Sequence, residues 1–308
     1  MFKVLLERFR EVLKSREIFS NWLSAAIHYV FINPRVFVKV FPGIMRTLGK
    51  GCIKVRCRFG GEVCVDPLIY GLTVKYHYIG LIKSVRCESR NNALIINNIP
   101  IKLNFMNEYV DLGSVKFKHF YYPILEVFVD QEYSAVDVNG RTVIDVGAYI
   151  GDSATYFVLR GAKKVIAIEP HPEAYQEMLE NIKLNNLEDK IIPMNAALGS
   201  KPGTIKITNV NIFETIGTYH GTNDIGDLEV PMITLSQLIK NYGVEPDVLK
   251  MDCEGCEYDV ILNDYEYVKL FSEVILEYHG DLMPLLNIMK RDYDCSVFDN
   301  ILYCRRRI

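Results

Sequence analysis

The sequence predicts an α/β fold around a parallel sheet that binds a nucleotide-like ligand at its strand ends. Three largely apolar runs carry this prediction, at residues 142–146, 165–168 and 249–251, although Asp145 and Lys250 interrupt two of them. Each is short enough to be a strand buried on both faces. Each is followed closely by glycine or acidic residues, which place polar chemistry where the strands stop. Ligands of such sheets bind outside the carboxyl ends of the strands, so we expect a binding crevice at this edge.

A glycine loop follows the first run. Thr142–Val146 ends at Gly147, Gly151 follows four residues later, and apolar residues then recur at helical spacing as far as Gly161. Glycine lets the backbone approach a ligand closely, and the start of a helix offers N–H donors to a polar group. Asp145 lies two residues before the loop, where its carboxylate could hold an ammonium group or order water. Taken alone, the loop is equally typical of a structural turn.

An acidic residue at the end of the second run narrows the choice of ligand. Glu169 stands 24 residues after Asp145, where a carboxylate can accept both hydroxyl protons of a ribose. The loop spacing is Asp-x-Gly-x-x-x-Gly, whereas a pyrophosphate needs the tighter Gly-x-Gly-x-x-Gly turn. A methionine tail with its ammonium group suits an acid at the strand end. The two features together predict S-adenosylmethionine, and the glycine spacing excludes an NAD-dependent oxidoreductase.

The alternation of helix and strand continues downstream. Pro172 suits the first turn of a helix, and a strand at 191–194 ends at Asn195 and Ala196, where the adenine would lie. Asn195 either hydrogen-bonds the base or caps a turn. The Gly-, Thr- and Asn-rich stretch 209–227 is long for a structureless connection and predicts a substrate or lid loop. The remaining predicted strands are at residues 274–279, 295–298 and 301–304, the last two joined as an antiparallel hairpin.

Five segments of the C-terminal half resemble one known family. They read VIDVGAYIGDSATYF, VIAIEPHPEAYQEMLENIKLNN, NAALGSKPGTIKI, VLKMDCEGCEYDVIL and VILEYHG. From about Val127 onward the chain resembles the FkbM-type S-adenosylmethionine-dependent methyltransferases, whose Asp-x-Glu-Gly-x-Glu signature is matched at 252–257. The resemblance implies a seven-stranded Rossmann-like sheet with an antiparallel C-terminal hairpin, and mostly O-methylation of sugars or natural-product scaffolds. The expected cofactor-binding residues are Asp145, Gly147, Ala148, Gly151, Glu169, Pro170, Asn195 and Ala196.

Two adjacent strand ends supply the candidate catalytic residues. Methyl transfer from a sulfonium is an in-line displacement, so the acceptor oxygen must be held near the methyl carbon and must lose its proton. The candidate bases are Asp252, Glu254, Glu277 and His279. Asp252, Glu254 and His279 could instead bind a divalent cation, although we favour a metal-free base. The structural alternatives are a turn role for Glu254 beside Gly255 and a local hydrogen bond for His279.

The chain is expected to have three parts. They are an N-terminal helical segment at 1–50, a β-rich accessory or substrate region at 51–138 and the methyltransferase domain at 139–308. Residues 2–14 carry one apolar stripe and predict an amphipathic helix, and residues 18–34 are uncharged. Polar residues interrupt the uncharged stretch, so a transmembrane helix is not expected. Residues 2–34 either pack against protein or lie on a membrane surface, which would make the protein membrane-associated.

The β-rich region is expected to contain two hairpins. One turns at Gly60-Gly61, and a weaker one turns at Asn97-Asn98. Such a sheet could cap the cofactor crevice and shape the acceptor pocket. Its tyrosines, which either stack on a sugar or pack in the sheet, are Tyr70, Tyr76, Tyr78, Tyr121 and Tyr122.

Composition limits the partners and the compartment. The net charge of −3 gives no broad basic field, so nucleic acid is not expected, and the acceptor is predicted to be a small molecule or glycan. Residues 1–17 are too charged for a signal peptide, so the eight cysteines are expected to be reduced in a cytoplasmic protein. Cys253 and Cys256 form a lone C-x-x-C motif. An RNA methyltransferase and a non-catalytic glycan-binding protein stay as alternatives, and the oligomeric state is not predicted.

Overall fold

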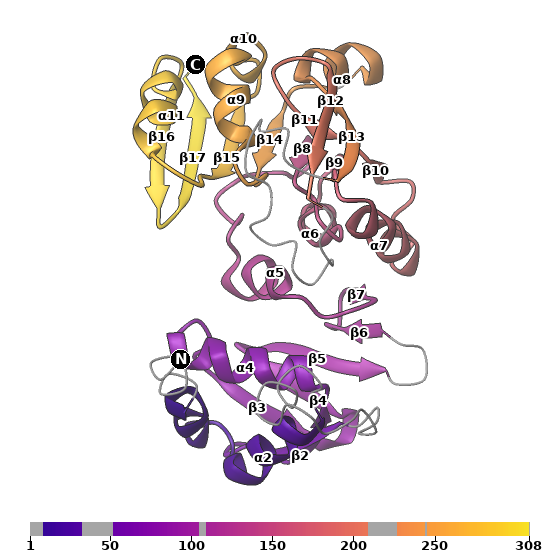
Figure 1. Ribbon diagram of the computed structural model, residues 1–308, viewed down its shortest axis with the longest axis vertical. Coiled ribbons are helices and arrows are strands. Elements are labelled where there is room, and N and C mark those ends of the chain that lie inside the picture. The colour runs from indigo at the N-terminus through magenta and orange to yellow at the C-terminus, as the bar shows by residue number, and fades with distance from the viewer. Residues whose placement is uncertain (1–8, 33–51, 105–108, 209–226, 244, 308) are drawn as a thin grey trace. The chain divides into compact units, whose positions relative to one another are not determined.

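The computed structural model describes residues 9–32, 52–104, 109–208, 227–243 and 245–307. The chain divides into two compact units, Met1–Asp130 and Gln131–Ile308 (Figure 1). All but the last residue of the predicted lid loop at 209–227 lies outside the described residues. Among the helices that are described, none is both long and apolar enough to cross a membrane.

The C-terminal unit is built on a seven-stranded mixed sheet in the order β10-β9-β8-β14-β15-β17-β16 (Figure 1). Its five parallel strands are β10 (Ile191–Met194), β9 (Lys164–Ile168), β8 (Thr142–Val146), β14 (Val248–Met251) and β15 (Glu273–Glu277). The hairpin of β16 (Tyr293–Phe298) and β17 (Ile301–Arg306) joins the sheet antiparallel to β15. The predicted Rossmann-like sheet with its antiparallel C-terminal hairpin is therefore confirmed.

Six helices of this unit are described. They are α6 (Asp152–Leu159), α7 (Pro172–Leu184), α8 (Leu235–Tyr242), α9 (Cys256–Asn263), α10 (Tyr265–Val268) and α11 (Leu282–Met289). Pro172 occupies the first turn of α7, as predicted, because its fixed φ suits that position and it has no N–H to leave unpaired. A capping box of Thr234 and Gln237 starts α8. Local sequence therefore determines where these helices begin.

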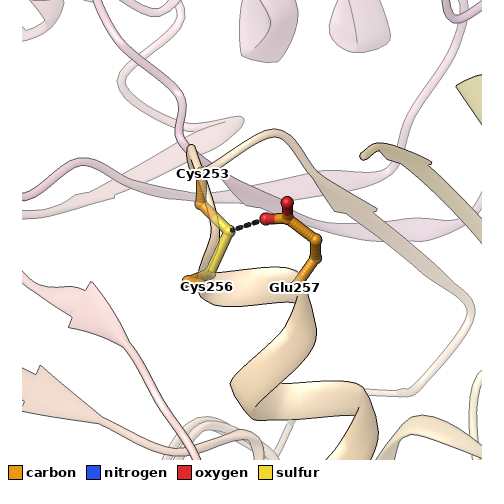
Figure 2. Close-up of side chains that lie close together, drawn as sticks. All are labelled: Cys253, Cys256 and Glu257. Carbon is orange, nitrogen blue, oxygen red and sulfur yellow. Dashed lines mark hydrogen bonds between the residues drawn. A yellow bond between two sulfur atoms is a disulfide. The ribbon is translucent and has the colours of Figure 1, made fainter. Parts of the chain in front are cut away.

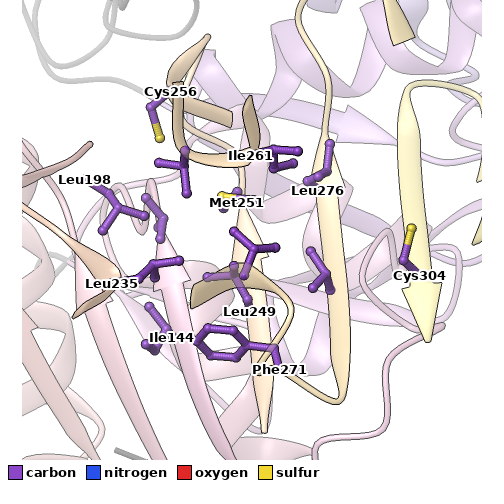
Figure 3. Close-up of a cluster of buried hydrophobic side chains, with 14 of the residues drawn as sticks. Ile144, Leu198, Leu235, Leu249, Met251, Cys256, Ile261, Phe271, Leu276 and Cys304 are labelled. Atoms are coloured by element: carbon purple, nitrogen blue, oxygen red, sulfur yellow. The ribbon is translucent and has the colours of Figure 1, made fainter. Parts of the chain in front are cut away.

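The two faces of the sheet carry different chemistry. Ile144 and Leu249 project from the central strands into an apolar cluster that includes Leu235 of α8 (Figure 3). Successive side chains of a strand point to opposite faces, so Asp145 and Lys250 lie on the other face. Both are fully buried, which makes that face unusual for a protein core.

A small second sheet interrupts the regular alternation. It contains β11 (Ala197–Leu198), β13 (Leu228–Ile233) and β12 (Gly203–Ile207) in that order. β13 pairs parallel with β11 and antiparallel with β12. No pattern in the sequence predicted this sheet.

The N-terminal unit contains two sheets and several helices. β1 (Ile53–Arg56) and β2 (Glu62–Val65) form a hairpin, and a five-stranded antiparallel sheet has the order β3-β4-β5-β6-β7. Its strands are β3 (Val85–Glu88), β4 (Ala93–Ile96), β5 (Ile99–Asn104), β6 (Tyr109–Asp111) and β7 (Lys116–Phe117). The helical elements are a 3₁₀ turn (Ser15–Glu17), α2 (Trp22–Ile32), α4 (Pro67–Ile79), a 3₁₀ turn (Ser89–Asn91), α5 (Tyr122–Leu125) and a π-helical turn (Glu126–Asp130).

Two hairpin predictions hold and one expectation is wrong. The turns at Gly60-Gly61 and Asn97-Asn98 join the paired strands, and both asparagines have positive φ. The expectation of a mainly β region missed α4, whose buried Tyr70 and Tyr76 are helical and not in a sheet. Packing of one helical face outweighs the strand preference of its aromatic and β-branched residues. Stacking of Tyr76 on Tyr122, with ring centroids 4.6 Å apart, favours the packing alternative for these tyrosines.

Part of the N-terminal prediction can be followed in the structure. Residues 9–14 are helical, and the rest of the predicted helix at 2–14 lies outside the described residues. Leu23 and Ile27 of α2 are exposed. Contact of residues 2–34 with a membrane surface stays a prediction.

The expectation of reduced cysteines is wrong. All eight cysteines are paired, as Cys52–Cys64, Cys57–Cys87, Cys253–Cys256 and Cys295–Cys304. Their Cα atoms lie 4.1–5.5 Å apart, which is close enough for a disulfide. Three of the pairs are 9 to 30 residues apart in the sequence, so the fold and not the local spacing brings them together.

Candidate functional site

The glycine loop after β8 lies against the loop after β14. Gly147 has a φ of 73°, and a Cβ atom at this position would overlap the backbone carbonyl of Asp252. Only glycine fits both requirements. The N–H groups of Gly147 and Ala148 each donate to the carbonyl of Ile168 at 3.0 Å, and Gly151, at φ 82°, precedes α6. The predicted loop residues therefore form one tight turn beside the loop that carries the Asp-x-Glu-Gly-x-Glu signature.

A buried ion pair lies beneath this loop. Asp145 and Lys250 are register partners on β8 and β14, and their charged atoms are 2.9 Å apart. The other carboxylate oxygen of Asp145 accepts a hydrogen bond from Ser153 at 2.7 Å. Protein groups therefore already engage the carboxylate that was predicted to hold the cofactor ammonium, and that role stays a prediction.

Lys250 is a residue of the site that the sequence analysis missed. Its ammonium group donates to the carbonyl of Gly147 at 2.9 Å and lies 3.3 Å from that of Val146. Burial alone would lower the pKa of Lys250, but the carboxylates of Asp145 and Asp252 outweigh it and raise that pKa. Lys250 therefore stays charged and holds the start of the glycine loop. A lysine within an apolar strand was the sequence signal that could have indicated a buried partner.

The end of β9 is organised by Glu169. Its two oxygens accept the backbone N–H groups of Tyr149, at 2.9 Å, and His171, at 2.7 Å. Burial raises the pKa of Glu169 to about 7, although both hydrogen bonds oppose the rise. Asn195 donates its amide to the carbonyls of Glu169 and Pro170 at 2.9 and 3.0 Å, so it caps this turn. Binding of ribose by Glu169 and of adenine by Asn195 and the buried Ala196 stay predictions.

The four predicted catalytic residues come together at the ends of β14 and β15. The His279 Nε2 atom lies 3.3 Å from a carboxylate oxygen of Glu254 and 3.8 Å from oxygens of both Asp252 and Glu277. All four side chains are 22–28% exposed. We call these four residues the acceptor cluster. Each side chain is therefore partly accessible from solvent.

Crowding of negative charge changes the acidity of the acceptor cluster. Burial and the neighbouring Asp252 raise the pKa of Glu277 to about 8. Burial alone would lower the pKa of His279, but its hydrogen bond to Glu257 and the carboxylates of Glu254 and Asp252 raise that pKa to about 9. Glu277 and His279 therefore bind protons more tightly than isolated side chains would.

Two residues that support the acceptor cluster were also missed. Glu257 is fully buried and contacts Nδ1 of His279 at 3.2 Å, and the hydroxyl of Tyr133 donates to Asp252 at 3.0 Å. Glu257 belongs to the signature motif, but nothing in the sequence shows that it faces a histidine 22 residues later. One ligand atom each from Asp252, Glu277 and His279 lie within 4.8 Å of one another, a spacing that a divalent cation could bridge.

The site lies inside a region with known relatives. Residues 145–291 match the family model of the methyltransferase FkbM domain. The predicted resemblance to the FkbM family is confirmed. The FkbM region contains the glycine loop, Glu169 and the acceptor cluster.

Individual relatives cover only part of the chain. The hexuronic acid methyltransferase AglP of Haloferax volcanii is 28% identical over 141 residues, which are 46% of this chain and 56% of AglP. The methyltransferase sdnD of Sordaria araneosa is 24% identical over an alignment of 186 positions, which covers 49% of this chain and 72% of sdnD. The chain thus spans about half the length of AglP. A crystal structure of the methyltransferase FkbM from Methylobacillus flagellatus, 18% identical, aligns with a TM-score of 0.43 over 60% of this chain and 48% of that one.

Proposed function

We propose that this protein is an S-adenosylmethionine-dependent methyltransferase that methylates a hydroxyl group of a sugar or a related small molecule. The observation that carries the proposal is the acceptor cluster, where one histidine meets three half-buried carboxylates directly beside the glycine loop. The match of the FkbM region supports methyl transfer. The name of AglP, a hexuronic acid methyltransferase, supports a sugar acceptor.

Each residue of the acceptor cluster has a chemical task in this proposal. Bound S-adenosylmethionine would supply the methyl group. The acceptor hydroxyl must lose its proton as its oxygen attacks, and positioned side chains can accept it. His279 in its neutral form offers Nε2, and the carboxylates of Asp252, Glu254 and Glu277 stabilise the imidazolium that results. No metal is needed for this route. The alternative is a divalent cation, for which the structure groups Asp252 and His279 with Glu277 and not with the predicted Glu254.

Cofactor binding can be tested at Glu169. Isothermal titration with S-adenosylmethionine should show about a tenfold to hundredfold weaker affinity in Glu169→Gln, because the neutral amide is a poorer acceptor for ribose hydroxyls. Glu273→Gln is the matched control. Glu273 is equally buried but lies at the amino end of β15, where it pairs with Arg141. Equal affinities in Glu169→Gln and the wild type would contradict the ribose assignment.

The acceptor can be tested with labelled cofactor. Transfer of a radiolabelled methyl group into fractionated lysate should label the glycan or small-molecule pool, and His279→Ala should abolish that labelling. Labelling of RNA would show that the acceptor is RNA and not a sugar or small molecule. Cofactor binding without any transfer would favour a non-catalytic glycan-binding protein. Loss of activity after EDTA treatment, with recovery on adding Mg²⁺, would favour the metal-assisted route.

A further inference from the structure

Glu257 is a buried carboxylate to which the proposed reaction assigns no task. It lies in the first turn of α9 and is fully buried. A buried carboxylate is costly unless hydrogen-bond donors surround it, so its contacts indicate what it stabilises. Those contacts come from His279, a member of the acceptor cluster, and from the loop that carries the signature motif.

One oxygen of Glu257 binds His279 twice. Oε1 accepts the backbone N–H of His279 at 3.1 Å and contacts its Nδ1 atom at 3.2 Å. An ionised carboxylate cannot donate, so the proton of this bond must lie on Nδ1. The ring is thereby fixed with Nε2 facing Glu254, Asp252 and Glu277. Nε2 is the atom that can exchange a proton with an acceptor.

The second oxygen of Glu257 is fixed by the signature loop. Oε2 accepts the N–H of Gly255 at 2.9 Å, and the Sγ atom of Cys253 lies 3.4 Å away (Figure 2). Glu254 and Gly255 both have positive φ, and the Cys253–Cys256 disulfide closes the turn. The loop therefore holds the Glu257 carboxylate in one place relative to β15.

We propose that Glu257 is a positioning residue that orients the His279 ring and fixes its tautomer for proton transfer in the acceptor cluster. The inference rests on the proposed function, because it assumes that His279 accepts the proton. Glu257 itself does not reach the acceptor: both of its oxygens are occupied by groups of the protein. Its effect should therefore appear in turnover and not in cofactor affinity.

The test compares two buried glutamates of the same sheet unit. Measured above about pH 9, where His279 is neutral in both the wild type and the variant, Glu257→Gln should lower kcat about tenfold to a hundredfold, because His279 loses the hydrogen-bond partner that orients its ring. The Kd of S-adenosylmethionine should stay unchanged. Glu273→Gln removes a carboxylate that is also buried but binds Arg141 and Tyr303. It should lower the melting temperature and keep the wild-type kcat. If Glu257→Gln does not fold, Glu257→Asp takes its place and should show a smaller loss of kcat.

A second readout does not depend on activity. Two-bond ¹H–¹⁵N spectra recorded above about pH 9, where His279 is neutral, show which ring nitrogen carries the proton, and His279→Ala identifies its signal. The wild type should carry the proton on Nδ1, and Glu257→Gln should not hold it there. A wild-type ring with its proton on Nε2 would overturn the proposal.

The kinetic outcomes separate this inference from the proposed function. If His279→Ala is inactive but folded Glu257→Gln keeps the wild-type kcat, the proposed base stands and the role of Glu257 is overturned. If His279→Ala keeps full activity, the proposed base is wrong. The role of Glu257 in proton transfer is then wrong as well, whichever ring nitrogen carries the proton in the spectra.

Discussion

The acidic side chains differ in burial between the two halves of the sheet edge. At the ends of β8 and β9, Asp145 and Glu169 are buried and each is fully engaged by protein groups. At the ends of β14 and β15, the carboxylates around His279 remain about one quarter exposed. The first arrangement suits a rigid cradle for a cofactor, and the second suits a site that exchanges protons. Under the proposed function, the methyl donor and the acceptor would bind at different positions along this edge.

The largest effect is expected from removing Lys250, the buried cation that pairs with Asp145. Lys250→Met leaves Asp145 buried and uncompensated, which should lower the free energy of unfolding by about 3–5 kcal/mol. The control is Lys163→Met, which removes an exposed lysine 3.5 Å from the exposed Glu245. This variant should lose less than about 1 kcal/mol of its free energy of unfolding. Urea denaturation measures both. Similar losses in the two variants would show that the buried pair is not what stabilises the loop.

Cofactor affinity and kcat should depend on pH in different ways, because they depend on Glu169 and His279 respectively. Glu169, with its pKa raised to about 7, must ionise to accept ribose hydroxyls, so the affinity for S-adenosylmethionine should rise with pH and level off above about 7. His279, with its pKa raised to about 9, is charged below that pH and becomes a base only as it loses its proton. The kcat should therefore keep rising, up to about tenfold per pH unit, until about pH 9. Isothermal titrations and initial rates recorded from pH 6 to 10 measure the affinity and the kcat. A kcat that is flat above pH 7 would contradict the role of His279.

Much of this edge could be predicted because parallel strands end together. The runs before Gly147, Glu169 and Asp252 are apolar, so the sequence predicts buried strands with polar ends at one edge. Adjacent strand ends also predicted that Asp252 and His279 would approach each other. Such predictions need only the order of the strands.

The supporting contacts depend on details that no single segment contains. Lys250 faces Asp145 because β14 and β8 pair in one particular register, and Glu257 faces His279 because the first turn of α9 meets the residues that follow β15. The helix α4 was missed for a different reason. Its buried residues recur at helical spacing, at Ile69, Thr73 and Tyr76, but its aromatic and β-branched composition favours strands.

The smallest expected effect distinguishes two disulfides of the same unit. Cys253–Cys256 closes the signature loop over three residues, and Cys295–Cys304 joins register partners of the β16–β17 hairpin. Replacing the first pair by serine should lower kcat about twofold to fivefold, because the turn that holds Glu257 loosens, at a stability cost of about 2 kcal/mol. Replacing the second pair should cost about 3 kcal/mol and leave kcat unchanged. Initial rates and thermal melts of the two double variants measure this, and an equal change of kcat in both would show that the signature-loop disulfide has no special connection to the acceptor cluster.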